Sequence, residues 1–155
     1  MSNNQISAEQ VKKLREETGA LVMDARKALL EADGDFEKAK EHLKAFGAAA
    51  VEKRAERETS QGVIETYIHV GGKVGSMVHL ACETDFVAKT DEFKTLAKEI
   101  AMQVAAMNPA DVDELAKQEY IRKPGKKIKD LVNEVISKTG ENVQIKKFSR
   151  YSLND

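Results

Sequence analysis

The fold is decided by residues 62–89, which read GVIETYIHVGGKVGSMVHLACETDFVAK. Apolar side chains recur at every second position on both sides of Gly71–Gly72, over residues 64–70 and again over residues 74–82. This period of two is typical of half-buried strands, and the paired glycines mark a turn between them. The segment therefore predicts an antiparallel hairpin.

The register of this hairpin depends on the length of its turn. A two-residue turn sets Ile64 against His79, whereas a three-residue turn sets Ile64 against Leu80. We expect the three-residue turn, Gly71 to Lys73, because it gathers the apolar side chains on one buried face. Cys82 then lies on the core face. The opposite face carries Tyr67, His69, Met77 and His79.

The segments after residue 90 predict helices that pack on the hairpin. An apolar stripe from Phe93 to Met107 indicates an amphipathic helix that ends at Asn108-Pro109. A short helical piece, a brief strand, a last helix and a terminal strand with a bulge are expected at 111–118, 119–121, 128–139 and 142–153. Residues 57–155 thus predict an α+β core domain, in which a small antiparallel sheet packs against helices.

Residues 1–56 predict a separate module of three helices. The sequence SAEQ at 7–10 has the form of a capping box, which begins the first helix. Each helix is expected to end at a glycine, namely Gly19, Gly34 and Gly47. Residues 48–58 contain strong helix formers without a continued apolar face, so we expect them to form a solvated linking helix.

The first connection between these helices is unusually apolar. Ala20 to Met23 stands where polar turn residues are expected. An exposed contact patch and a buried loop explain this run about equally well.

Composition excludes several classes of protein. The 25 basic and 26 acidic residues leave a net charge near zero, which excludes a globally basic nucleic-acid coat. No stretch reaches the roughly 20 apolar residues of a membrane span, and residues 1–5 do not resemble a secretory signal. We therefore expect a cytoplasmic protein that makes no contact with a membrane.

Catalytic and metal sites are not indicated. In the expected register Cys82 shares no face with a histidine, so we interpret it as a small buried residue and not as a nucleophile. The three histidines lack ligand spacing, and Gly71-Gly72 lacks the Lys-Ser/Thr sequel of a phosphate loop. We expect no enzyme activity, no cofactor and no metal.

Two surface segments are left as candidates. The basic segment Arg122–Lys129 is more typical of a solvated turn than of a nucleic-acid contact, because only Tyr120 lies nearby to stack on a base. The turn after the second strand has two explanations. Either Thr84 caps a helical turn with Phe86 packed inward, or Asp85 stands beside an exposed apolar wedge.

Several motifs lie along most of the chain, namely VKKLREETGA at 11–20, Met23-Asp24, CETDFVA at 82–88 and GEN at 140–142. Together these motifs resemble the elongation factor Ts family of bacterial translation. This resemblance implies that residues 1–56 form a ubiquitin-associated-like module with its linking helix. It also implies that residues 57–155 form a single copy of the dimerisation-type core domain.

The resemblance further implies a guanine-nucleotide exchange factor. Such a factor binds elongation factor Tu with its GDP and promotes GDP release by disturbing the Mg²⁺ and phosphate site of that GTPase. The partner-binding positions that it implies are Leu14, Val22, Met23, Thr84, Asp85, Phe86 and Val87. An RNA- or ribosome-associated protein that uses residues 122–129 is the alternative hypothesis.

One departure from the family bears on assembly. The chain between Pro109 and Tyr120 is shorter than usual, which resembles compact members whose core domains pair across two chains. A homodimer through the core domain is therefore a hypothesis, with Ile145, Phe148 and Tyr151 of the terminal strand as its apolar support.

Overall fold

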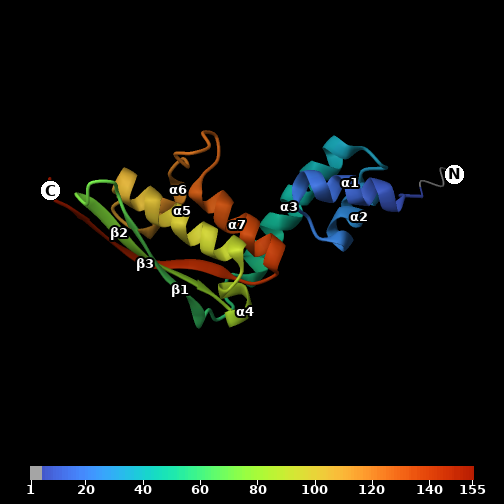
Figure 1. The fold of residues 1–155 in the computed structure, drawn as a ribbon. Coiled ribbons are helices and arrows are strands. Elements are labelled where there is room, and N and C mark those ends of the chain that lie inside the picture. The colour runs from blue at the N-terminus through green and yellow to red at the C-terminus, as the bar shows by residue number, and fades with distance from the viewer. Residues whose placement is uncertain (1–4) are drawn as a thin grey trace. The chain divides into compact units, whose positions relative to one another are not determined.

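A computed structural model describes residues 5–155 (Figure 1). The chain divides into two compact units, one that ends at Ala55 and one that runs from Glu56 to Asp155. The described part of the first unit is helical, whereas the second combines one antiparallel sheet with helices. The fold is therefore of the α+β class, as the sequence predicts.

The first unit contains the helices α1 (Ala8–Thr18), α2 (Val22–Glu31) and α3 (Phe36–Arg54). The predicted capping box begins α1, because the Ser7 hydroxyl accepts from the Gln10 N–H and the Gln10 side chain accepts from the Ser7 N–H. Gly19 ends α1 in the left-handed region, at φ 71°. Both signals of the first helix are confirmed.

The apolar stripes of these helices meet in one small core. Its members are Val11, Leu14, Ala25, Ala28, Leu29, Ala32 and Ala39. Four of the seven are alanines, and small side chains allow helix axes to approach closely. Larger residues, Ile6, Phe36, Leu43 and Phe46, pack at its margin.

The third helix does not end at Gly47. α3 continues through Gly47 to Arg54, so the expected third helix and the expected linking helix are one element. A glycine inside a helix costs about 1 kcal/mol relative to alanine. Ala48 to Ala50 follow directly and favour the helix, which explains why this single glycine is tolerated.

The second unit is built on a sheet with the strand order β1 (Gln61–Ile68), β2 (Val74–Cys82), β3 (Val143–Ser152). Between β2 and β3 the chain forms α4 (Asp85–Ala88), α5 (Asp91–Met107), α6 (Val112–Lys117) and α7 (Ile128–Thr139). Helices α5 and α7 lie across one face of the sheet (Figure 1). The expected arrangement of a small sheet packed against helices is confirmed.

Helix α5 is fixed to the sheet by apolar packing and by two side-chain hydrogen bonds. Its buried stripe includes Phe93, Leu96, Ala97, Ile100 and Val104. The Ser76 hydroxyl of β2 donates to the Ala101 carbonyl at 2.5 Å, and Arg150 Nε of β3 donates to the Ala105 carbonyl at 3.0 Å. The apolar packing and the two hydrogen bonds together hold α5 in one position over the strands.

The register of the hairpin differs from the expected one. Ile64 lies opposite His79, so the expected pairing of Ile64 with Leu80 is wrong. The strands are joined by the residues between His69 and Val74, since the His69 N–H donates to the Val74 carbonyl at 2.9 Å. This four-residue loop contains both glycines, and both have positive φ.

The observed register leaves the more apolar face of β1 uncovered. Ile64 and Ile68 are 59% and 66% exposed, while Tyr67 shares the helix-covered face with its buried partner Ser76. The expected place of Tyr67 on the other face is therefore wrong. His69 lies beyond the end of β1, and its Nδ1 is 3.0 Å from the Tyr67 hydroxyl.

Strand β2 explains this outcome. Its residues Val78, Leu80 and Cys82 are fully buried, so the side chains of β2 decide which face of the sheet meets the helices. Residues of β1 directly opposite them share that face whatever their polarity. Cys82 on the buried face, with Met77 and His79 on the opposite one, is confirmed.

Strand β3 contains the predicted bulge. Lys147 pairs with His79 and Ile145 pairs with Leu80, so Lys146 is the extra residue. Because of this insertion, Ile145 and Phe148 both lie on the face that the helices cover.

Residues 119–121 do not form the expected strand. Only an isolated bridge, between Glu119 and Lys127, is present there. The fully buried Gln103 of α5 binds this segment instead, since its amide donates to the Glu119 carbonyl at 3.0 Å and accepts from the Ile121 N–H at 3.1 Å. The Gln103 side chain thus satisfies the Glu119 carbonyl and the Ile121 N–H, which in a sheet would be paired by a neighbouring strand.

Candidate partner-binding site

Helix α4 is a single turn that follows β2 almost directly. The Thr84 hydroxyl caps it by accepting from the Val87 N–H at 3.4 Å. Val87 and Ala88 are buried, whereas Phe86 is 89% exposed. The predicted cap is confirmed. The predicted inward packing of Phe86 is wrong, because Val87 and Ala88 occupy the buried side of the turn and the Phe86 ring lies in solvent on the other side.

Asp85 stands beside Phe86 and is also exposed. Its Oδ2 lies 2.6 Å from Nζ of Lys89, which is exposed as well. An exposed ion pair one helical turn apart contributes little to stability, because water and salt compete with it. The Asp85 carboxylate is therefore available to accept hydrogen bonds from another molecule at small cost.

Glu141 holds the start of this turn. Its Oε1 accepts from the N–H groups of Glu83 and Thr84 at 3.1 and 2.9 Å, and its Oε2 accepts from the Thr84 hydroxyl at 2.6 Å. Glu141 directly follows Gly140, which ends α7 at φ 74° as predicted. One carboxylate thus binds both the backbone and the side chain of Thr84.

Glu83 makes the reciprocal contact at the end of the sheet. Its Oε1 accepts from the Asn142 N–H at 2.7 Å and lies 3.6 Å from Nη1 of Arg57. The Asn142 amide in turn donates to the Arg57 carbonyl at 2.9 Å. Side chains therefore continue the pairing of β2 with β3 beyond Cys82 and Val143, where the ladder ends.

Cys82 is a buried structural residue, as the sequence predicts. Burial raises the pKa of its thiol to about 11, and the negative charge of Glu141 acts in the same direction. The thiol donates to the Thr84 carbonyl at 3.2 Å. At neutral pH it is protonated and therefore a poor nucleophile.

The described residues offer no grouped metal ligands. Within 5–155, no three His, Cys, Asp or Glu side chains lie close enough together to hold a metal ion. No helix in the same range is both long enough and apolar enough to cross a membrane.

The apolar run of the first unit is exposed. Val22 and Met23, in the first turn of α2, are 47% and 69% exposed, and Leu21 before them is exposed as well. Arg15 Nε donates to the Ala20 carbonyl at 3.1 Å and so fixes the connection. The buried-loop explanation for this run is therefore wrong, and its part as a contact patch stays a prediction.

Leu14 differs from its neighbours in the implied site. Its side chain is fully buried in the core of the first unit. A role of Leu14 in binding therefore stays a prediction. Because it is buried, Leu14 can act on a partner only indirectly, through the packing of α1 against α2.

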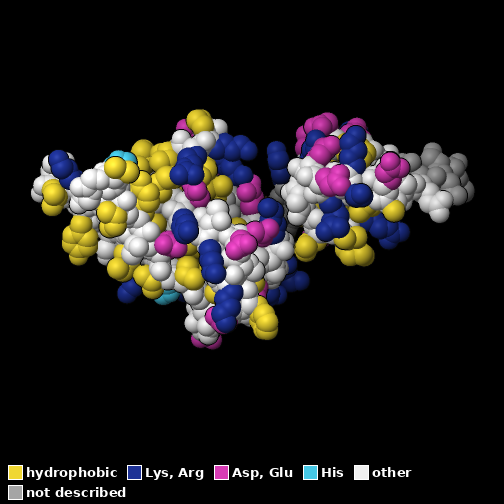
Figure 2. Space-filling view, in the orientation of Figure 1, with side chains coloured by type: hydrophobic (Ala, Val, Ile, Leu, Met, Phe, Trp, Pro, Cys, Tyr) yellow, Lys and Arg dark blue, Asp and Glu magenta, His cyan; other side chains and the backbone are white. Residues whose placement is uncertain are grey.

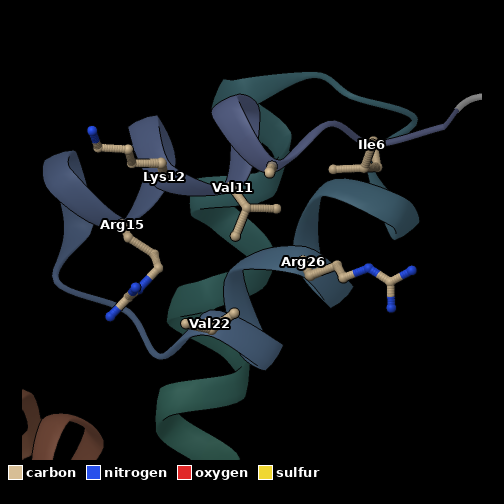
Figure 3. A pocket seen from close by; sticks show the side chains of 7 residues that line it. Ile6, Val11, Lys12, Arg15, Val22 and Arg26 are labelled. Atoms are coloured by element: carbon tan, nitrogen blue, oxygen red, sulfur yellow. The ribbon is translucent and has the colours of Figure 1, made fainter.

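A groove of about 380 Å³ lies beside the exposed patch. Its lining consists of Ile6, Ala8, Val11, Lys12, Arg15, Val22 and Arg26. Figure 3 shows Lys12 and Arg15 on α1 and Arg26 on α2, with Val11 and Val22 between them. The groove is thus apolar with a cationic rim.

The basic segment is partly neutralised by acidic residues. Arg122 Nη1 lies 3.1 Å from Glu99 Oε1, and Lys126 pairs with Glu134. Burial, together with the hydrogen bond from its hydroxyl to Glu99, raises the pKa of Tyr120 to about 12. Over the face seen in Figure 2, lysines and arginines lie among acidic side chains in both units.

Sequence reasoning did not assign a role to Glu141. It lies 57 residues from Thr84, so neither helical nor strand periodicity relates the two. Two signals mark Glu141 in the sequence: it belongs to the GEN motif at 140–142, and it stands between a glycine that ends a helix and a strand. Neither signal indicates that Glu141 binds Thr84.

Comparisons with known proteins identify the family. Residues 83–155 match the family model described as elongation factor TS. Elongation factor Ts of Thermotoga maritima is 42% identical over 194 aligned residues, which cover 97% of this chain and 98% of that protein. The factor of Desulfosudis oleivorans is 40% identical over 195, again covering 97% and 98%.

The aligned lengths also bear on the shortened region. An alignment of 195 positions exceeds the 155 residues of this chain, so these relatives contain segments without a counterpart here. Identity of this order nevertheless extends over 97% of the chain. The chain therefore belongs to the elongation factor Ts family.

Proposed function

We propose that this protein is a guanine-nucleotide exchange factor that binds elongation factor Tu with GDP and accelerates GDP release during translation elongation. The observation that carries the proposal is the 89% exposure of Phe86 on a turn whose other side is buried. An exposed phenyl ring next to an acceptor is costly to keep in water, so it points to a surface that binds another protein.

The mechanism is mechanical and not covalent. GDP in a GTPase is held by a phosphate cradle and by Mg²⁺, whose octahedral coordination tolerates little displacement. Phe86 inserts between side chains of the partner and shifts the segment behind its magnesium site. The metal then loses its geometry, the phosphates lose their counter-charge, and GDP leaves faster. This role requires no catalytic group on the exchange factor.

Asp85 supports the displaced state. A carboxylate accepts hydrogen bonds and has no proton to donate at neutral pH. Asp85 therefore holds N–H groups of the partner segment that Phe86 moves, and its negative charge disfavours a nearby phosphate. Thr84 and Val87 contribute by fixing the turn from its buried side.

The first unit supplies affinity. Val22 and Met23 form an exposed apolar patch that docks on the nucleotide-binding domain of the partner, and Leu14 supports the patch from the core. We also propose that this first unit is a ubiquitin-associated-like module. Docking through this patch and insertion of Phe86 are separable, because the residues lie in different units.

Thermodynamic linkage sets the order of events. If this protein lowers the affinity of elongation factor Tu for GDP a given number of times, GDP lowers the affinity of elongation factor Tu for this protein the same number of times. The same reciprocity applies to GTP. Rebinding of GTP therefore releases the exchange factor and completes the cycle.

A homodimer through the core domain is the second part of the proposal. The sheet face that α5 and α7 leave uncovered carries four exposed apolar side chains, Ile64, Ile68, Met77 and Tyr151. A second copy of this face covers them. Of the terminal-strand residues expected to support a dimer, Tyr151 is on this face, whereas Ile145 and Phe148 are on the helix side.

Binding to RNA through residues 122–129 is the weaker candidate. The ion pairs of Arg122 and Lys126 reduce the charge that this segment offers to phosphates. A salt titration separates the two functions. RNA binding through several phosphates falls steeply between 50 and 200 mM salt, whereas an apolar docking surface changes little.

The exchange function is tested by the release of a fluorescent GDP from elongation factor Tu, measured with Mg²⁺ and again with excess chelator. We expect a large acceleration with Mg²⁺ and a much smaller one without it, because the chelator has already removed the ion that the wedge disturbs. Equal acceleration in both conditions contradicts the magnesium mechanism. No acceleration in either contradicts the function.

A further inference from the structure

We infer that Glu141 is a positioning residue for nucleotide exchange, because its carboxylate fixes the start of α4 and so the direction in which Phe86 projects. The inference rests on the proposed exchange function. Glu141 binds Thr84 and the Glu83 N–H, and it acts on Phe86 through Thr84.

The contact determines how Thr84 caps the turn. A threonine hydroxyl has one proton to donate and two lone pairs that accept. Here the proton is donated to Glu141 Oε2 at 2.6 Å, which leaves a lone pair for the Val87 N–H. The carboxylate thus selects the hydroxyl orientation in which the cap works.

The backbone is fixed at the same point. Glu141 Oε1 accepts from the N–H groups of both Glu83 and Thr84, the two residues that precede α4. A helix of four residues is too short to be stable by its own hydrogen bonds. Its orientation depends on the burial of Val87 and Ala88 on one side and on this carboxylate at its start.

Phe86 cannot fix its own direction. With 89% of the residue exposed, the ring makes few contacts that hold it. A wedge must meet its partner in the correct direction, and a displacement of about 1 Å at a reacting site can lower a rate about a hundredfold. The position of the backbone under Phe86 therefore matters more than any contact of its ring in the free protein.

The substitution Glu141→Gln tests this contact with almost no change in shape. A glutamine keeps one oxygen for the N–H groups of Glu83 and Thr84, but its NH₂ donates where the carboxylate accepted. The Thr84 hydroxyl must then accept at this site with its second lone pair, so its proton loses the Glu141 acceptor and the short hydrogen bond to a charged group that fixes the hydroxyl is lost. Glu134→Gln is the matched control, since Glu134 is a glutamate of the neighbouring α7 that pairs with Lys126.

The readout is the rate of GDP release from elongation factor Tu at increasing concentrations of each variant. We expect Glu141→Gln to lower the plateau rate about tenfold while the half-saturating concentration changes less than about threefold, because the Val22–Met23 patch is intact. Glu134→Gln should match the wild type. In a Phe86→Ala background, Glu141→Gln should cause no further loss, since both changes remove the same wedge.

Each outcome decides the inference. The inference is overturned if Glu141→Gln reaches the wild-type plateau, or if it causes a full additional loss in the Phe86→Ala background. In either case the exchange function still stands, provided that the wild type accelerates release and Phe86→Ala reduces that acceleration. A wild type without any acceleration overturns both. If Glu141→Gln loses its cooperative thermal transition, Thr84→Val tests the same contact from the other side, and an undiminished plateau there overturns the inference equally.

Discussion

Phe86 and Val87 are adjacent in the chain and opposite in exposure: Phe86 is 89% exposed and Val87 9%. The two positions therefore separate binding from stability. Phe86→Ala should leave the free energy of unfolding unchanged within about 0.5 kcal/mol, as is usual for surface positions. Val87→Ala should lower it by about 2 kcal/mol, because two buried methyl groups are lost. Urea unfolding measures both. Equal losses in the two variants would contradict the assignment of the faces of α4.

Gly62 is required for steric reasons. A Cβ added there would lie 2.1 Å from the Leu80 carbonyl oxygen of the neighbouring strand, at a φ of +152°. Gly62→Ala should therefore lower the free energy of unfolding by more than about 3 kcal/mol. Gly71 is the control. It also has a positive φ, but a Cβ there meets nothing within 4 Å, so Gly71→Ala should cost roughly 1–2 kcal/mol. Thermal or urea unfolding of both variants measures these losses of stability. A larger loss in Gly71→Ala than in Gly62→Ala would contradict the close approach of β1 to β2 at Gly62.

Cys82 should react slowly with thiol reagents while the protein is folded. Its pKa is raised from 9.0 to about 11, which lowers the thiolate fraction at pH 8 about a hundredfold even before access is considered. The thiol is neutral in both states below the unfolded pKa. As pH rises above that value, the unfolded state ionises first, so the stability of the fold falls between about pH 9 and 11. Labelling with a chromogenic disulfide, with and without denaturant, measures the first effect. Rapid labelling of the folded protein at pH 8 would contradict it.

The uncovered sheet face predicts the state of assembly. Light scattering should give about 34 kDa, twice the 17.2 kDa of one chain, at micromolar concentration. Ile68→Glu places a charge in the centre of the apolar face and should restore the single-chain mass. Ile121→Glu, a change at an exposed position of the loop before α7, should leave the dimer intact. A single-chain mass for the wild type would contradict the dimer and would leave the proposed exchange function standing.

The helices were largely predictable from local signals. Ser7, Gly19, Asn108 and Gly140 each mark a helix end as the sequence predicts, since capping chemistry acts within a few residues. Gly47 shows the limit of this reasoning, because a helix can accommodate a glycine when its neighbours favour helix strongly enough. Start and stop signals are preferences of the local chain and not requirements.

The faces of the sheet were harder to predict. The apolar alternation of β1 indicated that Ile64 and Ile68 are buried, yet they lie on the uncovered face. Alternation shows that a strand has two different faces, but which one meets the helices depends on its partner β2. The contact of Glu141 with Thr84 is beyond local reasoning altogether, because it joins two loop ends that only the fold brings together.

We propose that Phe86 drives GDP release and that the Val22–Met23 patch of the first unit supplies affinity. The most direct test compares wild type, Phe86→Ala and Met23→Ala over a range of concentrations, with release of fluorescent GDP from elongation factor Tu as the readout. We predict that Phe86→Ala lowers the plateau rate at least about tenfold, whereas Met23→Ala raises the half-saturating concentration and leaves the plateau unchanged. A Phe86→Ala variant that reaches the wild-type plateau would contradict the role of Phe86 as the wedge.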